Sequence, residues 1–378
     1  MSAPRRLSGC LLAVLAVLLV AKPCTAAIGA SLVSPLGSGG KPPQFVLFTH
    51  DDAVTEDTHT LMLEVTEGRK SATNACPAVA TMFVTTANAA NDCELMMDLY
   101  QKGYEIADHT LSHLSVRGKK YQQVADEIVG LRDQLVKQCG ISKDEIVGFR
   151  APFLETDETV RKVLGDNGFL YDSSLIEETT GASVSRGLAE RLWPFDLANG
   201  SPINCDYFSG FQSCSTKESE PGLYDVPVWH IRQEDGKGNT KGVWSMDYVD
   251  GRSADDFYNI MKQNFDAAYS GNRAPIPIFI HTPWLQDKES LKGLKRFVDY
   301  ALAQPDTYLV SIRQLLAWMQ NPVPADQLTA ERLGCGNPGG APGSADGSSS
   351  SSSTTAAAAA PAPAPTPSRS GSGKNKAL

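Results

Sequence analysis

The chain has 378 residues, of which 42% are hydrophobic and 20% are charged, and its formal net charge is −9. About 310 residues lie between a short leader and a polar tail, which is long enough to build one large buried core. The acidic balance argues against a polyanionic partner such as nucleic acid.

The first 26 residues are typical of a secretory signal peptide. Arg5 and Arg6 precede an apolar run at 11–21, and small residues follow at 25–27. The run is shorter than the ~20 residues that cross a bilayer, so a signal peptide is favoured over a membrane anchor. No later segment is long and apolar enough to span a membrane. We therefore expect a signal peptide over 1–26, an N-terminal extension over 27–43, and a secreted or cell-wall protein.

Short strands alternate with helices along the body of the chain. The expected strands cover 44–49, 78–85, 105–108, 146–150, 169–172, 224–229, 277–281 and 307–311. The expected helices cover 93–102, 124–139, 157–167, 255–269 and 287–303. Seven or eight strand–helix repeats favour an α/β barrel. A doubly wound sheet is the alternative, but no glycine-rich phosphate loop follows the first strand.

Polar residues follow two of the expected strands. Asp51 and Asp52 end the first strand, where adjacent side chains on extended backbone point to opposite sides, so one can bind a metal while the other faces substrate or water. His109 and His113 follow the strand 105–108, and their spacing puts both imidazoles on one face of a helical turn. Two histidines and one carboxylate are typical of a catalytic metal site with open positions.

Two more strand ends carry candidates for chemistry. Arg150 ends the strand 146–150 as a permanent cation, which either holds a catalytic aspartate ionised or forms an ordinary surface ion pair. His281 ends an apolar strand at the same expected barrel face, where a general acid is the favoured interpretation.

These segments together resemble the polysaccharide deacetylase family, carbohydrate esterase family 4, and within it the chitin deacetylase-like branch. Residues 49–53 (THDDA) resemble the TFDD motif, and residues 109–113 (HTLSH) the H(S/T)xxH motif. Residues 150–153 (RAPF) resemble the RxP(F/Y) motif, and residues 278–281 (IFIH) the late LxxH motif. The resemblance implies a distorted (β/α) barrel with seven or eight strands, and we place the catalytic domain at 44–335.

The family's site residues carry over to matching positions of this chain. The implied metal ligands are Asp52, His109 and His113. The implied general base is Asp51, braced by Arg150, and the implied general acid is His281. The backbone N–H of Phe153, which follows Pro152, would help to stabilise the oxyanion. The ligand set favours Zn²⁺, with Co²⁺ or Ni²⁺ as alternatives.

The chain departs from the family pattern beside the implied base. His50 stands where the family usually has phenylalanine, and we expect a spectator rather than a tuner of Asp51 or a further metal contact. The aspartate that orients the late histidine is expected at Asp172, with Asp247 as the second candidate.

The activity implied by the resemblance is removal of acetyl groups from N-acetylglucosamine units of chitin or a related glycan. The alternatives are an O-acetyl xylan esterase, a peptidoglycan deacetylase, and a non-catalytic carbohydrate-binding wall or matrix protein. Trp229 and Trp284 are candidates for stacking on a sugar or for packing. We expect a monomer.

Without the leader, the chain has an even set of cysteines, which predicts disulfides in a secreted protein: Cys76, Cys93, Cys139, Cys205, Cys214 and Cys335. The favoured pair is Cys205 with Cys214, because it closes one short loop. Asn199-Gly200-Ser201 is a glycosylation sequon, weakened by the proline that follows. Residues 336–378 are rich in Ser, Ala and Pro and are expected to be a disordered tail, either a plain spacer or an O-glycosylated segment.

Overall fold

The computed structural model describes residues 29, 31–87, 91–178, 187–235, 237, 239–248 and 253–341. The expected signal peptide, and the expected tail beyond residue 341, lie outside these ranges.

One large sheet forms the centre of the described molecule. Its order is β12-β1-β2-β3-β4-β5-β8-β7, and β13 pairs with the first half of β1. All pairings in this sheet are parallel except that of β7 with β8. The strands are β1 Gln44–Asp51, β2 Thr81–Val84, β3 Glu105–Asp108, β4 Gly148–Phe149, β5 Tyr171–Asp172, β7 Phe195–Leu197, β8 Glu220–Asp225, β12 Ile276–Ile280 and β13 Thr307–Leu309.

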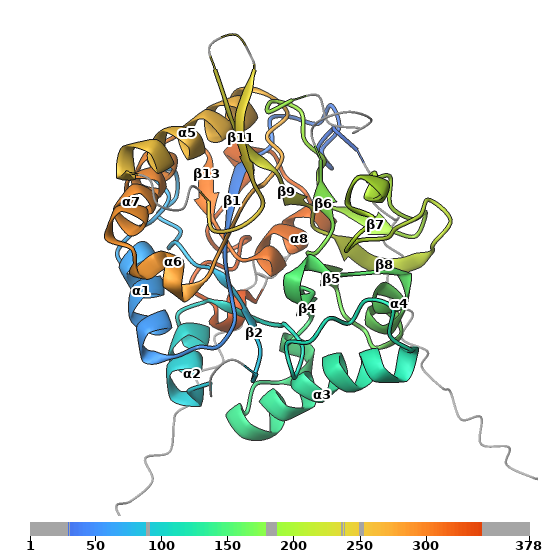
Figure 1. Ribbon diagram of the computed structural model, residues 1–378. Coiled ribbons are helices and arrows are strands. Elements are labelled where there is room, and N and C mark those ends of the chain that lie inside the picture. Colours follow the sequence, from blue (N-terminus) through green and yellow to red (C-terminus); the bar gives the residue numbers. More distant parts are fainter. Residues whose placement is uncertain are drawn as a thin grey trace, which may run out of the picture.

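Helices follow most of the parallel strands. They are α1 Glu56–Thr66, α2 Cys93–Gln101, α3 Tyr121–Cys139, α4 Glu158–Asp166, α5 Ala254–Ser270, α6 Thr282–Gln286, α7 Lys288–Leu302 and α8 Ile312–Gln320. Several begin after a side chain that caps free backbone N–H groups, such as Asp157 before α4 and Ser311 before α8. In Figure 1 the sheet curls through the middle of the molecule, and the helices α1 to α5 and α7 lie outside it. The expected distorted (β/α) barrel is thereby confirmed.

The barrel is distorted where one expected strand is broken. The segment 224–229 divides into β8, which ends at Asp225, and β9, Val228–Trp229, with Pro227 between them. Proline has no N–H to donate to a sheet ladder, so it marks the break. β8 pairs with β5, whereas β9 pairs with β6, Ile176–Glu177, and contacts β12. A hairpin of β10, Ile231–Glu234, and β11, Thr240–Trp244, projects from this region (Figure 1).

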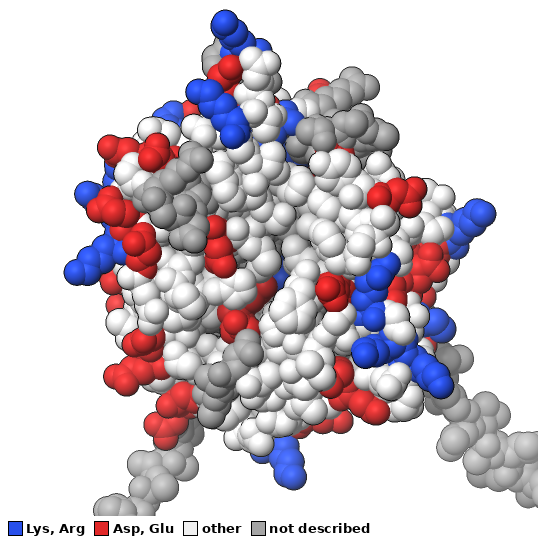
Figure 2. Space-filling view, viewed as in Figure 1, with Lys and Arg blue, Asp and Glu red and all other residues white. Residues whose placement is uncertain are grey.

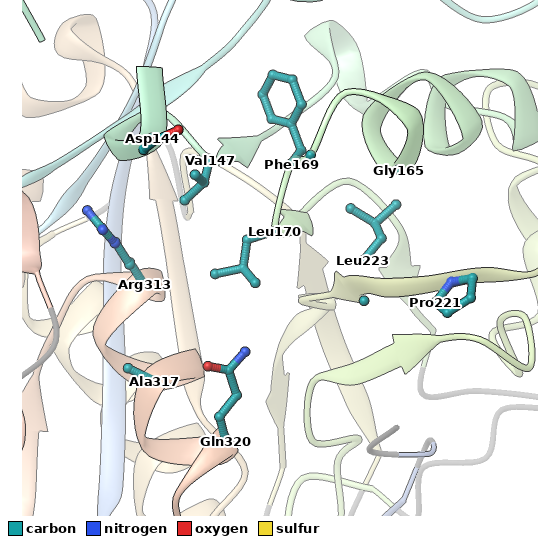
Figure 3. A pocket seen from close by; sticks show the side chains of 12 residues that line it. Asp144, Val147, Gly165, Phe169, Leu170, Pro221, Leu223, Arg313, Ala317 and Gln320 are labelled. Atoms are coloured by element: carbon teal, nitrogen blue, oxygen red, sulfur yellow. The ribbon is translucent and has the colours of Figure 1, made fainter. Parts of the chain in front are cut away.

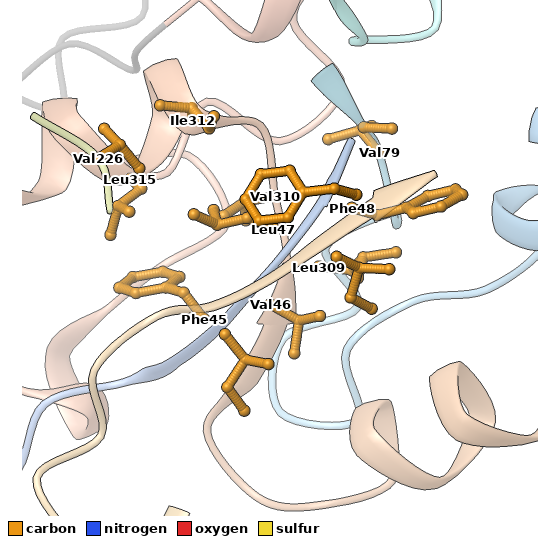
Figure 4. Packing of buried hydrophobic residues seen from close by; sticks show 14 of the residues in the cluster. Phe45, Val46, Leu47, Phe48, Val79, Val226, Leu309, Val310, Ile312 and Leu315 are labelled. Carbon is orange, nitrogen blue, oxygen red and sulfur yellow. The ribbon is translucent and has the colours of Figure 1, made fainter. Parts of the chain in front are cut away.

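The first strand is the centre of the core. All eight residues of β1 are buried, as expected for a parallel strand covered on both faces. Figure 4 shows Phe45, Val46, Leu47 and Phe48 among the side chains that follow β13 and begin α8. This packing fixes the direction in which β1 leaves the core, and the carboxyl end of β1 carries the first candidate residues.

A buried carboxylate holds α8 against the amino ends of the strands. Glu105 accepts hydrogen bonds from the backbone N–H of Arg313 (2.9 Å), from Thr81 (3.0 Å) and from the Tyr171 hydroxyl (3.0 Å). A negative group at a helix N-terminus complements the helix dipole. Near this end of the sheet lies a pocket of about 500 Å³, lined by Val147, Leu170 and other residues (Figure 3). It faces away from the carboxyl ends of the strands, so it is separate from the site described below.

Three disulfides lie in the described part of the chain. The predicted bond between Cys205 and Cys214 is confirmed, and the others join Cys93 to Cys139 and Cys76 to Cys335. Packed structure continues beyond the boundary expected at residue 335, since a short 3-10 helix covers Pro338–Gly340. None of the described helices combines the length and apolar character needed to cross a membrane.

Candidate active site

The carboxyl end of β1 delivers two aspartates to one site. Asp51 is the last residue of the strand, and Asp52 follows with a left-handed backbone (φ 89°). A left-handed backbone is uncommon for a residue other than glycine, although aspartate tolerates it better than most. The turn lets both carboxylates join the same cluster, whereas a continued strand would point them to opposite sides. The backbone N–H of Asp52 donates to the carbonyl of Phe83 (3.0 Å), which holds the turn in place.

Arg150 holds Asp51 in the interior. Its guanidinium donates to Asp51 Oδ1 (2.6 Å), to the Thr49 hydroxyl (2.9 Å) and to Ser173, and it lies between the rings of Phe83 and Phe279. Both members of the pair are fully buried. Burial alone raises the pKa of Asp51, but the charge and hydrogen bond of Arg150, together with the nearby His109 and His281, outweigh burial and hold the pKa below its ordinary value. Asp51 is therefore an ionised carboxylate with one oxygen bound to the cation.

Two residues that hold Arg150 had no assigned role in the sequence interpretation. Thr49 belongs to the THDDA motif, but nothing in the sequence indicates that its hydroxyl accepts a hydrogen bond from Arg150. Ser173 uses both its carbonyl and its hydroxyl, and it lies on a different strand end. Only the fold brings these residues together, so no local pattern could have identified them.

The two histidines lie on a loop after β3 rather than on the helical turn that was predicted. Thr110 (φ 67°) and His113 (φ 52°) are both left-handed, which a helix does not allow. The prediction of a helix was therefore wrong, while the closeness of the rings was right, because their centroids are 5.0 Å apart. Two left-handed residues shorten the loop enough to bring the rings together.

His109 is preset as a ligand. Its Nδ1 lies 2.7 Å from the carbonyl oxygen of Arg150, which can only accept, so Nδ1 carries the proton and Nε2 has a free lone pair. Burial lowers the pKa of His109 to about 4 despite the opposing charge of Asp51. The imidazole is thus neutral at physiological pH, which is the form that binds a metal.

Asp52, His109 and His113 fit a divalent metal. One donor atom from each lies within 4.8 Å of the others, and His113 Nε2 is 3.4 Å from Asp52 Oδ1. Two imidazoles and one carboxylate form a three-ligand set that leaves positions open for water or substrate. The fit rests on the preset tautomer of His109 as well as on the distances.

His281 lies beside this cluster and is held by Asp247. His281 Nδ1 is 2.7 Å from Asp247 Oδ2, and the backbone N–H of His281 donates to Asp247 Oδ1 (2.9 Å). Burial alone lowers the pKa of His281, but the hydrogen bond to Asp247 and the charge of Asp51 outweigh it and raise the pKa to about 9. A cationic imidazole with a free Nε2–H can donate a proton.

Asp172, which the sequence favoured as the partner of His281, lies elsewhere. It accepts a hydrogen bond from the Ser174 hydroxyl and is paired in register with Asp225 on β8. Burial raises the pKa of Asp172 to about 6, and the charges of Arg161, Glu218 and Arg150 have smaller effects on it. The structure thus brings Asp247 and not Asp172 to His281, because the backbone N–H of Asp247 bonds to the carbonyl of Phe279 on β12, whereas four strands separate β5 from β12 in the sheet.

The remaining candidates divide between the site and the core. Phe153 is 60% exposed, and its ring contacts His113 with a centroid separation of 4.8 Å. It follows Pro152 in a 3-10 turn, where the turn itself offers no acceptor to its N–H. Trp229 and Trp284 are 1% and 6% exposed, so their burial assigns them to packing rather than to a sugar subsite.

His50, the residue before Asp51 on β1, is fully buried. Burial lowers its pKa to about 3, so its ring is neutral. Its Nε2 lies 2.9 Å from the hydroxyl of Thr282, the residue that follows His281.

Figure 2 shows acidic side chains near the centre of the face in view, with most Lys and Arg side chains towards its edge.

Comparison with known proteins places the chain in a family. The sequence profile of the polysaccharide deacetylase family matches residues 38–171. Chitin deacetylase 8 of Bombyx mori is 30% identical over 291 residues, which cover 75% of this chain and 72% of that relative. Chitin deacetylase 1 of Bombyx mori is 27% identical over 291 residues, but these make up 51% of its length, so the chain spans about half of that relative.

A solved structure has the same fold. The crystal structure of a protein from Mycobacterium smegmatis, assigned as a polysaccharide deacetylase, superposes with a TM-score of 0.52 at 17% identity and covers 78% of this chain and 97% of its own. The chain is a member of the polysaccharide deacetylase family, carbohydrate esterase family 4. Within that family it belongs to the chitin deacetylase-like group.

Proposed function

We propose that this chain is a secreted, metal-dependent deacetylase that hydrolyses the N-acetyl groups of N-acetylglucosamine units in chitin or a related glycan. One observation carries the proposal: an ionised carboxylate held by Arg150 and a protonated imidazole held by Asp247 flank a three-ligand cluster. A protein that only binds carbohydrate needs neither a base nor an acid, so these residues favour catalysis over a wall or matrix protein without activity.

Asp52, His109 and His113 would hold the metal, with Zn²⁺ preferred and Co²⁺ or Ni²⁺ as alternatives. When bound, such an ion lowers the pKa of water towards ~7 and polarises the acetyl carbonyl. The hydrogen bond from His109 to the Arg150 carbonyl keeps the Nε2 lone pair directed at the cluster.

The proton transfers fall to Asp51 and His281. Asp51 Oδ1 is bound to Arg150, so Asp51 Oδ2, 4.0 Å from His109 Nε2, is the oxygen that accepts the proton of the attacking water. His281 Nδ1 is bound to Asp247, so His281 Nε2–H delivers a proton to the departing amine nitrogen. The N–H of Phe153 stabilises the negative charge on the carbonyl oxygen. Acetate and a free amine result.

The proposal also covers the division of the chain into a leader, an extension, a catalytic domain and a tail. A leader over 1–26, removed on secretion, precedes an extension over 27–43 and a catalytic domain that begins at residue 44. The disulfides described above accord with an extracellular site of action. A tail rich in Ser, Ala and Pro, either a plain spacer or an O-glycosylated segment, follows the catalytic domain.

The test is release of acetate by the purified protein from chitin oligomers, acetylated xylan and peptidoglycan, each with and without a chelator. We expect chelator-sensitive release from chitin oligomers. Release from xylan or peptidoglycan alone would assign the fold to another acetylated substrate, and release from none would overturn the proposal. Asp51→Asn should abolish release at unchanged metal content, and Asp326→Asn, at an exposed aspartate, serves as the matched control.

A further inference from the structure

A chain of hydrogen bonds links the strand of the proposed base to the helix that follows the proposed acid. His50 lies on β1, next to Asp51, and its Nε2 is 2.9 Å from the Thr282 hydroxyl. The Thr282 hydroxyl is 2.8 Å from that of Thr58 on α1, which donates to the carbonyl of Ala53 (3.0 Å). The path joins β1, α6 and α1, and its side chains are buried at His50 and Thr58 and partly buried at Thr282.

The protons in this chain have one arrangement that satisfies every contact. The Ala53 carbonyl can only accept, so Thr58 donates its single hydroxyl proton there and must accept from both Thr282 and Thr55, whose hydroxyl lies 3.0 Å away. Thr282 then has no proton left for His50, so His50 donates through Nε2–H. The remaining ring nitrogen, Nδ1, is buried and has no hydrogen-bond partner among the described residues. The opposite arrangement would bury an N–H without an acceptor and remove the donor from Ala53.

The link acts on His281 through the backbone. Thr282 is the first residue of α6, and His281 is the residue that caps this helix. Asp247 holds His281 from one side, and the bond from His50 holds the next residue from the other. Phenylalanine, the residue that the related motif carries at this position, could fill the space but could not donate a hydrogen bond.

We propose that His50 is a positioning residue that fixes His281 relative to Asp51 by donating a hydrogen bond to Thr282. This inference rests on the proposed function, in which Asp51 and His281 move the protons. Displacement of an oriented group by about 1 Å can lower a rate up to ~100-fold, so loss of the link should appear in kcat and not in KM.

Four substitutions separate the hydrogen bond from the packing. His50→Phe and Thr282→Val remove the donor and the acceptor, and each should lower kcat for acetate release about 10-fold with KM within about twofold. Glutamine carries its amide nitrogen as many bonds from the backbone as His50 Nε2, so His50→Gln should retain most of the activity. His50→Asn places its amide one bond too short and should behave like His50→Phe. Wild-type kcat in His50→Phe, or equal losses in His50→Gln and His50→Asn, would overturn the proposal.

A second measurement does not depend on turnover. Nitrogen-15 spectra of histidine-labelled protein should show His50 as the neutral Nε2–H tautomer, with an Nε2–H signal that is lost in Thr282→Val. The Nδ1–H signal of His281 should shift in His50→Phe and stay in place in His59→Phe, a matched control at a histidine that pairs with Asp98 outside the site. An unshifted His281 signal in His50→Phe overturns the inference. Absence of acetate release by the wild-type protein would instead overturn the proposed function, and the spectra would still decide the role of His50.

Discussion

Asp247 forms two hydrogen bonds with His281: one carboxylate oxygen accepts the ring Nδ1–H (2.7 Å), and the other accepts the backbone N–H (2.9 Å). The first contact fixes the orientation of the ring and the second fixes the residue that carries it. The same carboxylate favours the cationic imidazole, and the charge of Asp51 adds to this effect, so Asp247 contributes to both the geometry and the charge of the proposed acid.

Asp247→Asn should move the alkaline limit of activity to lower pH. His281 is protonated below a pKa of about 9, so the acid is available below this pH and is lost as pH rises through it. Loss of the carboxylate lowers the pKa, and we expect kcat at pH 8 to fall about 100-fold or more. The pH profile of kcat for Asp247→Asn, Asp172→Asn and the wild type checks this. An alkaline limb that moves in Asp172→Asn instead would assign the orienting role to the residue that the sequence favoured.

Arg150→Met should destabilise the protein and shift the acid limit of activity. It leaves the Asp51 carboxylate buried without its cation, a change that costs about 3–5 kcal/mol in unfolding free energy. The pKa of Asp51 should rise, so the acid limb of kcat/KM moves to higher pH. Urea unfolding and a pH profile measure the two effects. Arg296→Met is the matched control at an exposed ion pair with Asp255, where we expect little change because solvent screens the pair. Equal losses at both sites would contradict the assignment.

Alanine at any of the three proposed ligands should abolish metal binding. For Asp52→Ala, His109→Ala and His113→Ala we expect a metal content near zero by elemental analysis, because each removes one of three donors. Added Zn²⁺ should raise the melting temperature of the wild type and leave these variants unchanged, since a ligand that binds only the folded state stabilises it. His59→Ala is the control. Stoichiometric metal in any of the three variants would show that its residue is not a ligand.

Asp172→Asn should flatten the pH dependence of stability. Burial raises the pKa of Asp172 from 3.8 to about 6, so the folded state keeps a proton that the unfolded state has released. This contribution is present below pH 4 and is lost as pH rises through about 6, and the difference in pKa corresponds to about 3 kcal/mol. The unfolding free energy of the variant should therefore gain on the wild type between pH 4 and pH 7. Asp326→Asn should run parallel to the wild type, and a parallel curve for Asp172→Asn would refute the prediction.

Much of the fold could be predicted from the sequence because the apolar runs are continuous. The strand 105–108 and the helices α2, α4 and α7 lie within one or two residues of their expected limits. β1, expected at 44–49, continues to Asp51, and all eight of its residues are buried. Helices α1 and α8 were not expected. The apolar period of α1 is weak, whereas α8 carries Ile312, Leu315, Leu316 and Met319 at helical spacing after the cap Ser311, a signal that the sequence interpretation missed.

The site could be predicted only in part. Asp51 ends a strand, and Asp52, His109, His113 and His281 follow strands. Parallel strands bring such residues to one end of the sheet. The partner of His281 could not be identified in this way, because Asp247 lies in an irregular segment whose path depends on the whole barrel. The conformation of the loop that carries His109 and His113 could not be predicted either. Its left-handed residues are Thr110 and His113, and threonine and histidine do not indicate a left-handed backbone as glycine would.

The bond between Cys76 and Cys335 spans 259 residues of the chain, and it closes almost the entire catalytic domain into one covalent ring. A protease that cuts a single loop within this ring would not release a fragment. The nicked protein would migrate as one species until it was reduced, because the disulfide would keep the two pieces covalently linked.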